Sequence, residues 1–251
     1  MAEDLRETRS ELVPSGDRVV MLSGASRGIG AALARRLLAD GFRLSLGVRN
    51  PGSTRGKFQD VDPRRLIVCR FDAFEPASAE AWVADTLERF GRLDVLINNA
   101  GMTKPLSFAE GGEDALDDLW SVNVKAPFRL IRLALPHLSK SGGGRIINVA
   151  STDAKRYRDE TVSIAYAATK HAVLALTHAA KFAGWESGVR VTALCPGGVD
   201  TDFIAGVPGV TPAANRIAPA TLGEIVSLLL KLPNNASVAE LVVNTRLEST
   251  L

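Results

Sequence analysis

The chain has 251 residues, 46% of them hydrophobic, which is enough for one large α/β domain with a substantial core. Its 30 basic and 28 acidic residues give a net charge of +2 and are distributed along the chain, so no nucleic-acid-binding surface is indicated. Neither a membrane-spanning apolar segment nor a secretory signal pattern is present, so we expect a cytoplasmic protein.

Apolar runs that are typical of strands alternate with helical patterns along the chain, which is the order expected of a doubly wound parallel sheet. Strands are predicted over residues 18–23, 43–48, 66–70, 95–98, 145–149, 190–194 and 241–243. Helices are predicted between them over residues 29–39, 77–90, 115–138, 164–183 and 221–230. The fold class predicted is therefore α/β, a single Rossmann-type parallel sheet of about seven strands with helices on both faces.

Two segments lie outside this alternation. Residues 1–16 are charged and poorly periodic, so we predict a mobile N-terminal extension ahead of a single Rossmann-fold domain over residues 17–251. Residues 50–62 contain Gly, Pro and Ser and are predicted to form a loop. Both cysteines, Cys69 and Cys195, fall in predicted strands, where a free thiol usually acts as a small core hydrophobe, so neither a disulfide nor a metal site is indicated.

A glycine-rich turn joins the first predicted strand to the first predicted helix, with the spacing Gly-x-x-x-Gly-x-Gly. Glycines let the backbone turn tightly and approach a pyrophosphate, whose charge the unpaired amides at the helix N-terminus can hold. The turn predicts a dinucleotide site, and a glycine-rich turn without a ligand is the alternative. The cofactor-binding residues predicted here are Gly24, Ser26, Arg27, Gly28, Ile29 and Gly30.

Two arginines bear on which dinucleotide would bind. An acidic side chain at the end of the second strand would accept hydrogen bonds from the adenosine ribose and repel a 2′-phosphate. Val48 occupies that position, Arg49 follows it, and Arg27 lies within the glycine turn. Because two guanidinium groups could bind the extra phosphate, the sequence favours NADP(H) over NAD(H). The alternative is that both arginines are ordinary exposed residues.

Tyr166 and Lys170 lie one turn apart on the same face of a predicted helix. A free tyrosine has a pKa of about 10 and is a poor acid–base catalyst at neutral pH unless a nearby cation favours the phenolate. Lys170 would supply one cation, and an oxidised nicotinamide ring would supply a second. The pair is therefore predicted to transfer protons, with Tyr166 as the general acid/base.

Several polar and glycine residues directly follow the predicted strands. Ligands of open α/β sheets bind at the carboxyl ends of the strands, where the strand order reverses. Since these ends meet at one edge of a parallel sheet, the residues that follow them are expected to form one site. They are Gly24, Arg49, Asp72, Asn98, Ser151 and Pro196.

Together, from about residue 17 to residue 198, these motifs resemble the short-chain dehydrogenase/reductase family. The resemblance implies that Asn123, Ser151, Tyr166 and Lys170 are catalytic. The interval from Ser151 to Tyr166 is slightly longer than is common in the family, which leaves Thr152 as an alternative to Ser151. Asp72 would contact the adenine, or merely cap a turn. Further coenzyme contacts are implied for Asn98, Ala100, Gly101, Tyr166, Lys170, Pro196, Gly197, Val199 and Thr201.

The resemblance also implies a reaction, in which a hydride passes between nicotinamide and a small carbonyl/alcohol substrate. Tyr166 would exchange the proton, Ser151 would hold the substrate oxygen, and Lys170 would bind the nicotinamide ribose. Asn123 would hold a water in contact with Lys170, and with Pro127 nearby it is expected to distort its own helix. Family members are often dimers or tetramers joined through two long helices, so a homodimer or homotetramer is expected.

Three alternatives stay open at this stage. A catalytically silent NADP(H)-sensing regulatory protein could use the same fold. An S-adenosylmethionine methyltransferase on a related fold would leave Tyr166 and Lys170 unexplained. An inserted segment over residues 153–163 could rim the substrate mouth, although its charges are more typical of a solvated surface than of a site that recognises an acid.

Overall fold

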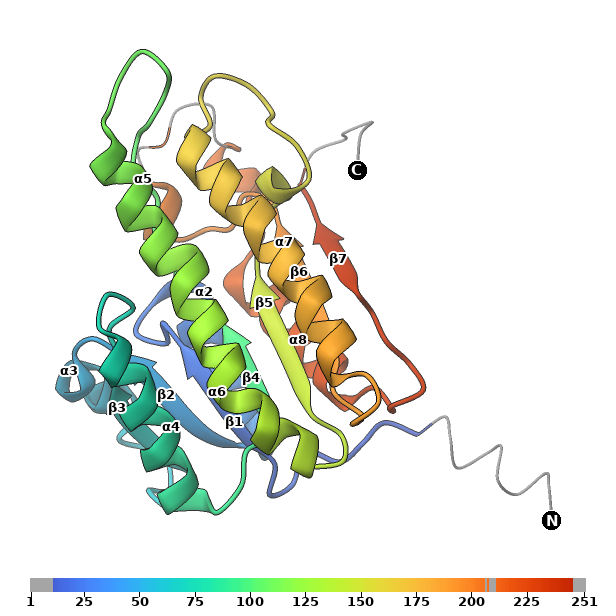
Figure 1. Ribbon diagram of the computed structural model, residues 1–251. Coiled ribbons are helices and arrows are strands. Elements are labelled where there is room, and N and C mark those ends of the chain that lie inside the picture. The colour runs from blue at the N-terminus through green and yellow to red at the C-terminus, as the bar shows by residue number, and fades with distance from the viewer. Residues whose placement is uncertain (1–10, 206, 208–210, 246–251) are drawn as a thin grey trace.

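The seven predicted strands form one parallel sheet (Figure 1). A computed structural model describes residues 11–205, 207 and 211–245. The strand order is β3-β2-β1-β4-β5-β6-β7, which reverses direction between β1 and β4 and confirms the doubly wound α/β fold. The strands are β1 (Val19–Ser23), β2 (Arg43–Val48), β3 (Leu66–Arg70), β4 (Val95–Asn98), β5 (Arg145–Val149), β6 (Arg190–Pro196) and β7 (Glu240–Val243).

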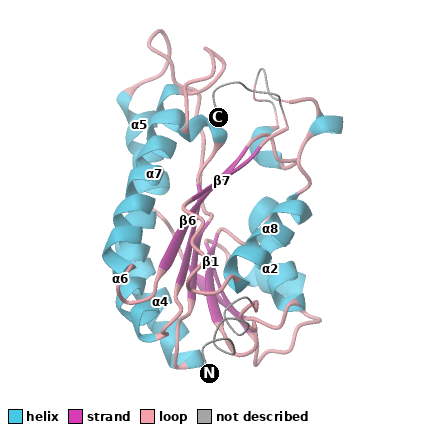
Figure 2. Cartoon of the chain, turned by 90° about the vertical axis from the view of Figure 1, so that its right-hand side faces the viewer, coloured by secondary structure: helices cyan, strands magenta, loops and turns pink. Residues whose placement is uncertain are grey.

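Helices cover both faces of the sheet, as Figure 2 shows. Helices α2 and α8 lie on one face, and α4, α6 and α7 lie on the other with the shorter α5. No helix in the described ranges is both long and apolar enough to cross a membrane. The bounds are α2 (Gly28–Ala39), α4 (Pro76–Phe90), α5 (Glu113–Trp120), α6 (Ala126–Lys140), α7 (Ile164–Gly184) and α8 (Pro219–Lys231).

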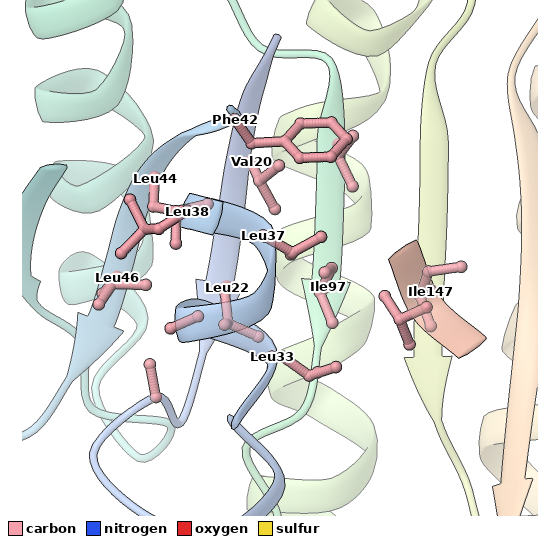
Figure 3. Packing of buried hydrophobic residues seen from close by; sticks show 14 of the residues in the cluster. Val20, Leu22, Leu33, Leu37, Leu38, Phe42, Leu44, Leu46, Ile97 and Ile147 are labelled. Carbon is pink, nitrogen blue, oxygen red and sulfur yellow. The ribbon is translucent and has the colours of Figure 1, made fainter. Parts of the chain in front are cut away.

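Helix α2 is held on the sheet by leucines that share one face of the helix. Leu33, Leu37 and Leu38 are buried in one cluster with Val20 and Leu22 of β1 (Figure 3). Each fully buried leucine contributes about 2 kcal/mol of hydrophobic free energy. Because α2 begins at the glycine turn, this packing fixes the turn at the end of β1.

The single helix predicted over residues 115–138 is wrong, because the chain there forms α5, a π-helical turn over Ser121–Lys125, and α6. Pro127 has no amide hydrogen, so the carbonyl of Asn123 loses its usual helical partner. The amide of Ala126 instead bonds the carbonyl five residues back. The distortion expected around Asn123 is thus confirmed, and π-helical turns of this kind are frequent at functional sites.

The loop predicted over residues 50–62 is also partly wrong, because it contains the short helices α3 (Pro51–Arg55) and η1 (Gly56–Phe58). Proline is favoured at the start of a helix, where its missing amide hydrogen leaves no bond unmade. Phe58 is only 4% exposed and belongs to the cluster beneath α2. Burial of this one aromatic ring orders a segment whose composition is typical of loops.

The N-terminal extension predicted over residues 1–16 is bound to the domain where the structure describes it. Residues 1–10 lie outside the described residues. The amide of Val13 donates to the carbonyl of Lys231 at the end of α8, over 2.7 Å, and the Ser15 hydroxyl donates to the carbonyl of Asp40. Residues 11–16 therefore contact the domain at these two points, and the mobility of the extension stays a prediction.

Candidate active site

A cavity of about 580 Å³ opens at the carboxyl ends of the strands. It is lined by residues that follow β1, β2, β3, β4, β5 and β6, which is where ligands of this fold bind. Two of the predicted site residues, Asn98 and Asn123, do not line it. The predicted residues that do are Gly24, Ser26, Arg27, Gly28, Ile29, Gly30, Arg49, Asp72, Ala100, Gly101, Ser151, Tyr166, Lys170, Pro196, Gly197, Val199 and Thr201.

The glycine turn packs so closely against neighbouring backbone that no larger side chain fits at Gly24 or Gly30. Gly24 has a φ of +71°, and a Cβ on it would lie 2.9 Å from the Cα of Ala100. A Cβ on Gly30 would lie 2.2 Å from the carbonyl oxygen of Gly24. No side chain caps the first turn of α2, so its amides remain available to an anion in the cavity. The turn therefore fits a pyrophosphate.

Asn99, and not Asn98, holds this turn against β4. The Asn99 side-chain amide donates to the carbonyls of Ser23 and Gly24 over 3.0 and 3.1 Å, and the Ser23 hydroxyl accepts the amides of Asn99 and Ala100. Asn98 is 4% exposed and donates to Asn148 of β5 over 2.8 Å. Because successive strand side chains point to opposite faces, a shift of one residue separates a sheet contact from a cavity contact. The structure thus corrects the direct coenzyme contact expected of Asn98.

Basic side chains gather around the glycine turn. Arg27 and Arg49 both line the cavity, and Arg27 forms an exposed ion pair with Asp202 over 3.7 Å. Lys57, from the unpredicted helical segment, donates to the carbonyl of Ser26 over 2.7 Å. Sequence reasoning missed Lys57 because it assigned that segment to a loop. These three cations make this part of the cavity suitable for a phosphate.

Asp72 lies after β3 on the wall of the same cavity. Its carboxylate accepts the amide of Phe74 over 3.0 Å, and its backbone carbonyl accepts the Ser78 hydroxyl over 2.9 Å. The turn-capping role that the sequence allowed is therefore present. The carboxylate still faces the cavity and retains capacity to accept further hydrogen bonds.

Tyr166, Lys170 and Ser151 come together where β5 meets α7. The Ser163 hydroxyl accepts the amide of Tyr166 over 3.3 Å and so caps the start of α7. Lys170 Nζ lies 5.6 Å from the centre of the Tyr166 ring and donates to the carbonyl of Val149 over 2.8 Å. The Ser151 hydroxyl lies close enough to the Tyr166 phenol to oppose the rise in its pKa. This contact favours Ser151 over Thr152 as the residue paired with the phenol.

Burial controls the protonation of both α7 side chains. It raises the pKa of Tyr166, the nearby Asp153 carboxylate raises that pKa further, and the neighbouring Ser151 hydroxyl opposes both effects. Burial also lowers the pKa of Lys170 to about 8. In the protein alone, burial therefore keeps the pKa of the phenol high, so lowering it depends on the second positive charge that the sequence prediction required.

Asn123 lies behind the cavity wall, on the π-helical turn. Its amide group accepts the backbone amide of Met102 over 2.9 Å, donates to the carbonyl of Met102 over 3.0 Å, and donates to the Thr169 hydroxyl over 3.1 Å. A Cβ on Gly101 would lie 3.4 Å from Asn123 Oδ1 and 3.7 Å from Lys170 Nζ. Asn123 thus fixes the loop after β4 next to the ammonium group, without itself reaching the cavity.

The wall of the cavity beyond Tyr166 contains residues that sequence reasoning did not assign. The ring of Phe203 lies 6.0 Å from the ring of Tyr166, measured between centroids. The inserted segment over residues 153–163 contributes side chains to this wall, so it does rim the site. The only feature of the sequence that pointed to this segment was the long interval between Ser151 and Tyr166. The unassigned lining residues are Thr103, Asp153, Arg158, Thr161, Ser163, Phe203, Ile204 and Val207.

One cavity is lined by the glycine turn, Ser151, Tyr166 and Lys170. The family to which the sequence is similar agrees with this arrangement. The family model described as short chain dehydrogenase matches residues 18–208. The chain belongs to the short-chain dehydrogenase family. Members of this family are oxidoreductases, and the match argues against the methyltransferase alternative.

Known short-chain dehydrogenases and reductases are similar to this one in both sequence and structure. An agropine synthesis reductase from Rhizobium rhizogenes is 36% identical over 221 residues, which cover 88% of this chain and 50% of that protein. The chain therefore spans about half the length of that relative. An alcohol dehydrogenase from the archaeon Thermococcus sibiricus, solved with 5-hydroxy-NADP, is 31% identical with a TM-score of 0.80, covering 90% of this chain and 95% of that one.

A third similar protein was solved with the other dinucleotide. It is a 3-ketoacyl-(acyl-carrier-protein) reductase from Brucella melitensis in complex with NADH, 26% identical with a TM-score of 0.84, covering 92% of this short-chain dehydrogenase and 98% of that chain. Similar structures thus hold dinucleotides with the 2′-phosphate or without it. The choice of coenzyme must be argued from the residues of this chain.

Proposed function

We propose that this protein is an NADP(H)-dependent oxidoreductase that interconverts a small carbonyl compound and its alcohol, with Tyr166 as general acid/base. The observation that supports it best is the convergence of Ser151, Tyr166 and Lys170 on a cavity that also holds the glycine turn. When bound, the nicotinamide coenzyme supplies or accepts the hydride. The glycines that line the cavity and the uncapped start of α2 fit its pyrophosphate.

Each side chain then has a distinct task. The hydroxyls of Ser151 and Tyr166 hold the substrate oxygen, and the phenol donates its proton as negative charge develops there during reduction. Lys170 Nζ uses one N–H on the carbonyl of Val149 and keeps two N–H donors for the ribose hydroxyls. Asn123 positions the loop after β4 beside Lys170, and a water held there would return the proton.

The test is oxidation of NADPH with a panel of ketones, aldehydes and keto esters, followed at 340 nm. Turnover of one member of the panel, with its alcohol as the product, would support the proposal. A catalytically silent NADP(H) sensor remains the alternative. Tight NADPH binding in calorimetry with no oxidation by any member would favour that sensor.

Coenzyme preference gives a separate prediction. We expect the double variant Arg27→Ser, Arg49→Ala to bind NADPH at least about tenfold more weakly, because hydrogen bonds to charged groups contribute about 1.5–3 kcal/mol each. Binding of NADH should change less than threefold, since it has no 2′-phosphate. Fluorescence titration of both dinucleotides measures this difference. Arg64→Gln is the matched control, because Arg64 is exposed, pairs with Asp62 and lies outside the cavity.

An equal loss of NADPH and NADH binding by the double variant would contradict this assignment. It would mean that the two guanidinium groups hold the turn or the shared pyrophosphate. Lys57 then becomes the next candidate for the 2′-phosphate, because its ammonium group is already anchored on the carbonyl of Ser26.

We also propose that the protein forms a homodimer or homotetramer through the outer surfaces of α5, α6 and α7. Large apolar side chains are exposed on these helices, among them Trp120, Phe128, Phe182 and Trp185. Phe182 is 90% exposed, which is unfavourable for an aromatic side chain in water. Light scattering should give a dimer or tetramer mass, and Phe182→Glu with Phe128→Glu should lower it. A monomer mass at micromolar concentration would contradict the proposal.

A further inference from the structure

The ring of Phe203 lies beside the ring of Tyr166 and lines the same cavity. The two ring centroids are 6.0 Å apart, and the ring planes are inclined by 51°. Aromatic rings attract one another at this separation and tilt. Phe203 is half-buried, so part of its ring is still open to a molecule bound in the cavity.

The segment that carries Phe203 leaves the sheet from a fixed base. Phe203 belongs to the short helix η4 (Asp202–Ile204), which follows β6. Before and after this helix, Val199 and Ile217 form a parallel bridge, and both side chains are buried in one cluster with Leu222 of α8. The aromatic ring is therefore placed against the phenol by an anchored part of the chain.

The wall that contains Phe203 is apolar. Phe203, Ile204 and Val207 line the cavity with hydrocarbon side chains. A carbonyl compound whose oxygen is held by Ser151 and Tyr166 brings one of its substituents against this wall. A polar substituent there would lose hydration without gaining a hydrogen bond from these side chains, whereas an apolar one is stabilised as its surface leaves water. A flat aromatic ring gains further from contact with the ring of Phe203.

Polar side chains line the cavity as well. They include Thr103, Thr161 and Ser163. The charged residues Asp153 and Arg158 also line it, and both have partners within the protein. A second large apolar substituent would be buried against these polar groups. The cavity therefore fits a substrate with one apolar substituent and a second one that is small or polar.

We infer that Phe203 is a specificity-determining residue, which selects substrates that carry an aromatic ring on the reacting carbon. The inference rests on the proposed function and adds a substrate class to it, the aryl ketones and aryl aldehydes and the corresponding benzylic alcohols. A hydride from NADPH and the proton of Tyr166 convert the aryl ketone to the benzylic alcohol, and NADP⁺ is the other product. Phe203 takes no part in that transfer and acts by contact with the substrate ring.

The experiment compares acetophenone with cyclohexyl methyl ketone, which has a saturated ring of the same number of carbons. Their intrinsic reactivities cancel when the ratio of their kcat/KM values in a variant is divided by the same ratio in the wild type. With NADPH, Phe203→Leu should lower the ratio of acetophenone to cyclohexyl methyl ketone about fivefold, the effect of an aromatic contact beyond its buried area. Phe203→Tyr keeps the ring and should leave that ratio within about twofold of wild type.

Binding gives a measurement that does not depend on turnover. NADP⁺ cannot reduce a ketone, so the complex of the protein with NADP⁺ can be titrated with each ketone by saturation-transfer NMR. The dissociation constant of acetophenone should rise about fivefold in Phe203→Leu, and that of cyclohexyl methyl ketone should change less than about twofold. Phe108→Leu is the matched control, because Phe108 is 98% exposed and lies outside the cavity lining, so it should change neither quantity.

The outcomes separate this inference from the function beneath it. Turnover of both ketones with a ratio that does not move in Phe203→Leu would overturn the role of Phe203 and leave the oxidoreductase proposal standing. An equal loss of kcat/KM for both ketones would overturn it too, because it would show that the ring only holds Tyr166 in place. NADPH oxidation by no member of the carbonyl panel would remove the proposed function, and the inference with it.

Discussion

The Tyr166→Phe variant is expected to lose at least about 10³-fold in kcat while its affinity for NADPH changes less than twofold. General acid–base catalysis contributes about 10²–10⁴-fold, and the phenyl ring of the variant has no proton to donate. The phenyl ring keeps its packing beside Phe203, whose centroid is 6.0 Å away. Single-turnover oxidation of NADPH and a fluorescence titration measure the two quantities.

The matched control uses the other tyrosine among the two in the chain. Tyr157 is 49% exposed and donates its hydroxyl to the carbonyl of Val162 over 3.0 Å, outside the cavity lining. Tyr157→Phe should therefore lose at most about 1.5 kcal/mol of stability and keep full turnover. Full turnover in Tyr166→Phe would end the assignment of Tyr166 as the acid.

The groups around Tyr166 determine which protonation state of the phenol is favoured. Burial and the Asp153 carboxylate both raise the pKa of Tyr166, which keeps the phenol protonated and suits it to donate a proton during reduction. Alcohol oxidation needs the phenolate and so requires a compensating positive charge. Lys170 and an oxidised nicotinamide together would supply it, which explains why neither the phenol nor the lysine alone makes a base at neutral pH.

The sheet and the glycine turn were predictable because their signals are local. Short apolar runs bounded by turns mark the parallel strands, and the glycines at 24, 28 and 30 mark a turn where the backbone passes close to other atoms. The order of strand ends then brings Ser151, Tyr166 and Lys170 to one cavity. Fold and site position follow from these few rules.

The parts that were missed depend on single residues in tertiary context. Asn98 bonds within the sheet and Asn99 bonds the glycine turn, because side chains of successive residues point to opposite faces. At the end of a strand the sequence pattern does not show which of the two residues faces the cavity. The helical turns before Phe58 exist because that ring is buried under α2. The Asp153 carboxylate reached the site through an insertion, whose sequence gives length and charge but not direction.

Lys170 carries the second large prediction, and it concerns stability as well as activity. The ammonium group is 5% exposed, and burial lowers its pKa from 10.5 to about 8. Since one pKa unit corresponds to about 1.4 kcal/mol, holding Lys170 protonated at pH 7 costs the folded state about 3 kcal/mol. The hydrogen bond from Lys170 to the carbonyl of Val149 offsets about 1 kcal/mol of this cost, which is the net contribution of a typical hydrogen bond.

We therefore expect Lys170→Met to lose at least about 100-fold in kcat/KM and yet to gain about 2 kcal/mol in the free energy of unfolding at pH 7. The sign can be checked against pH. Between about pH 8 and 10.5 the unfolded chain holds a proton on Lys170 that the folded protein has released, so the stability of the wild type rises with pH in that window. The advantage of the variant should shrink accordingly.

Urea unfolding at pH 7 and pH 9.5 measures this gap, and Lys125→Met is the control, because Lys125 is exposed on the π-helical turn. A Lys170→Met variant that is less stable than wild type at pH 7 would show that the lysine holds the fold together through Val149. A more stable, inactive variant would show the opposite: this ammonium group is kept in a costly position because the chemistry beside Tyr166 needs its charge.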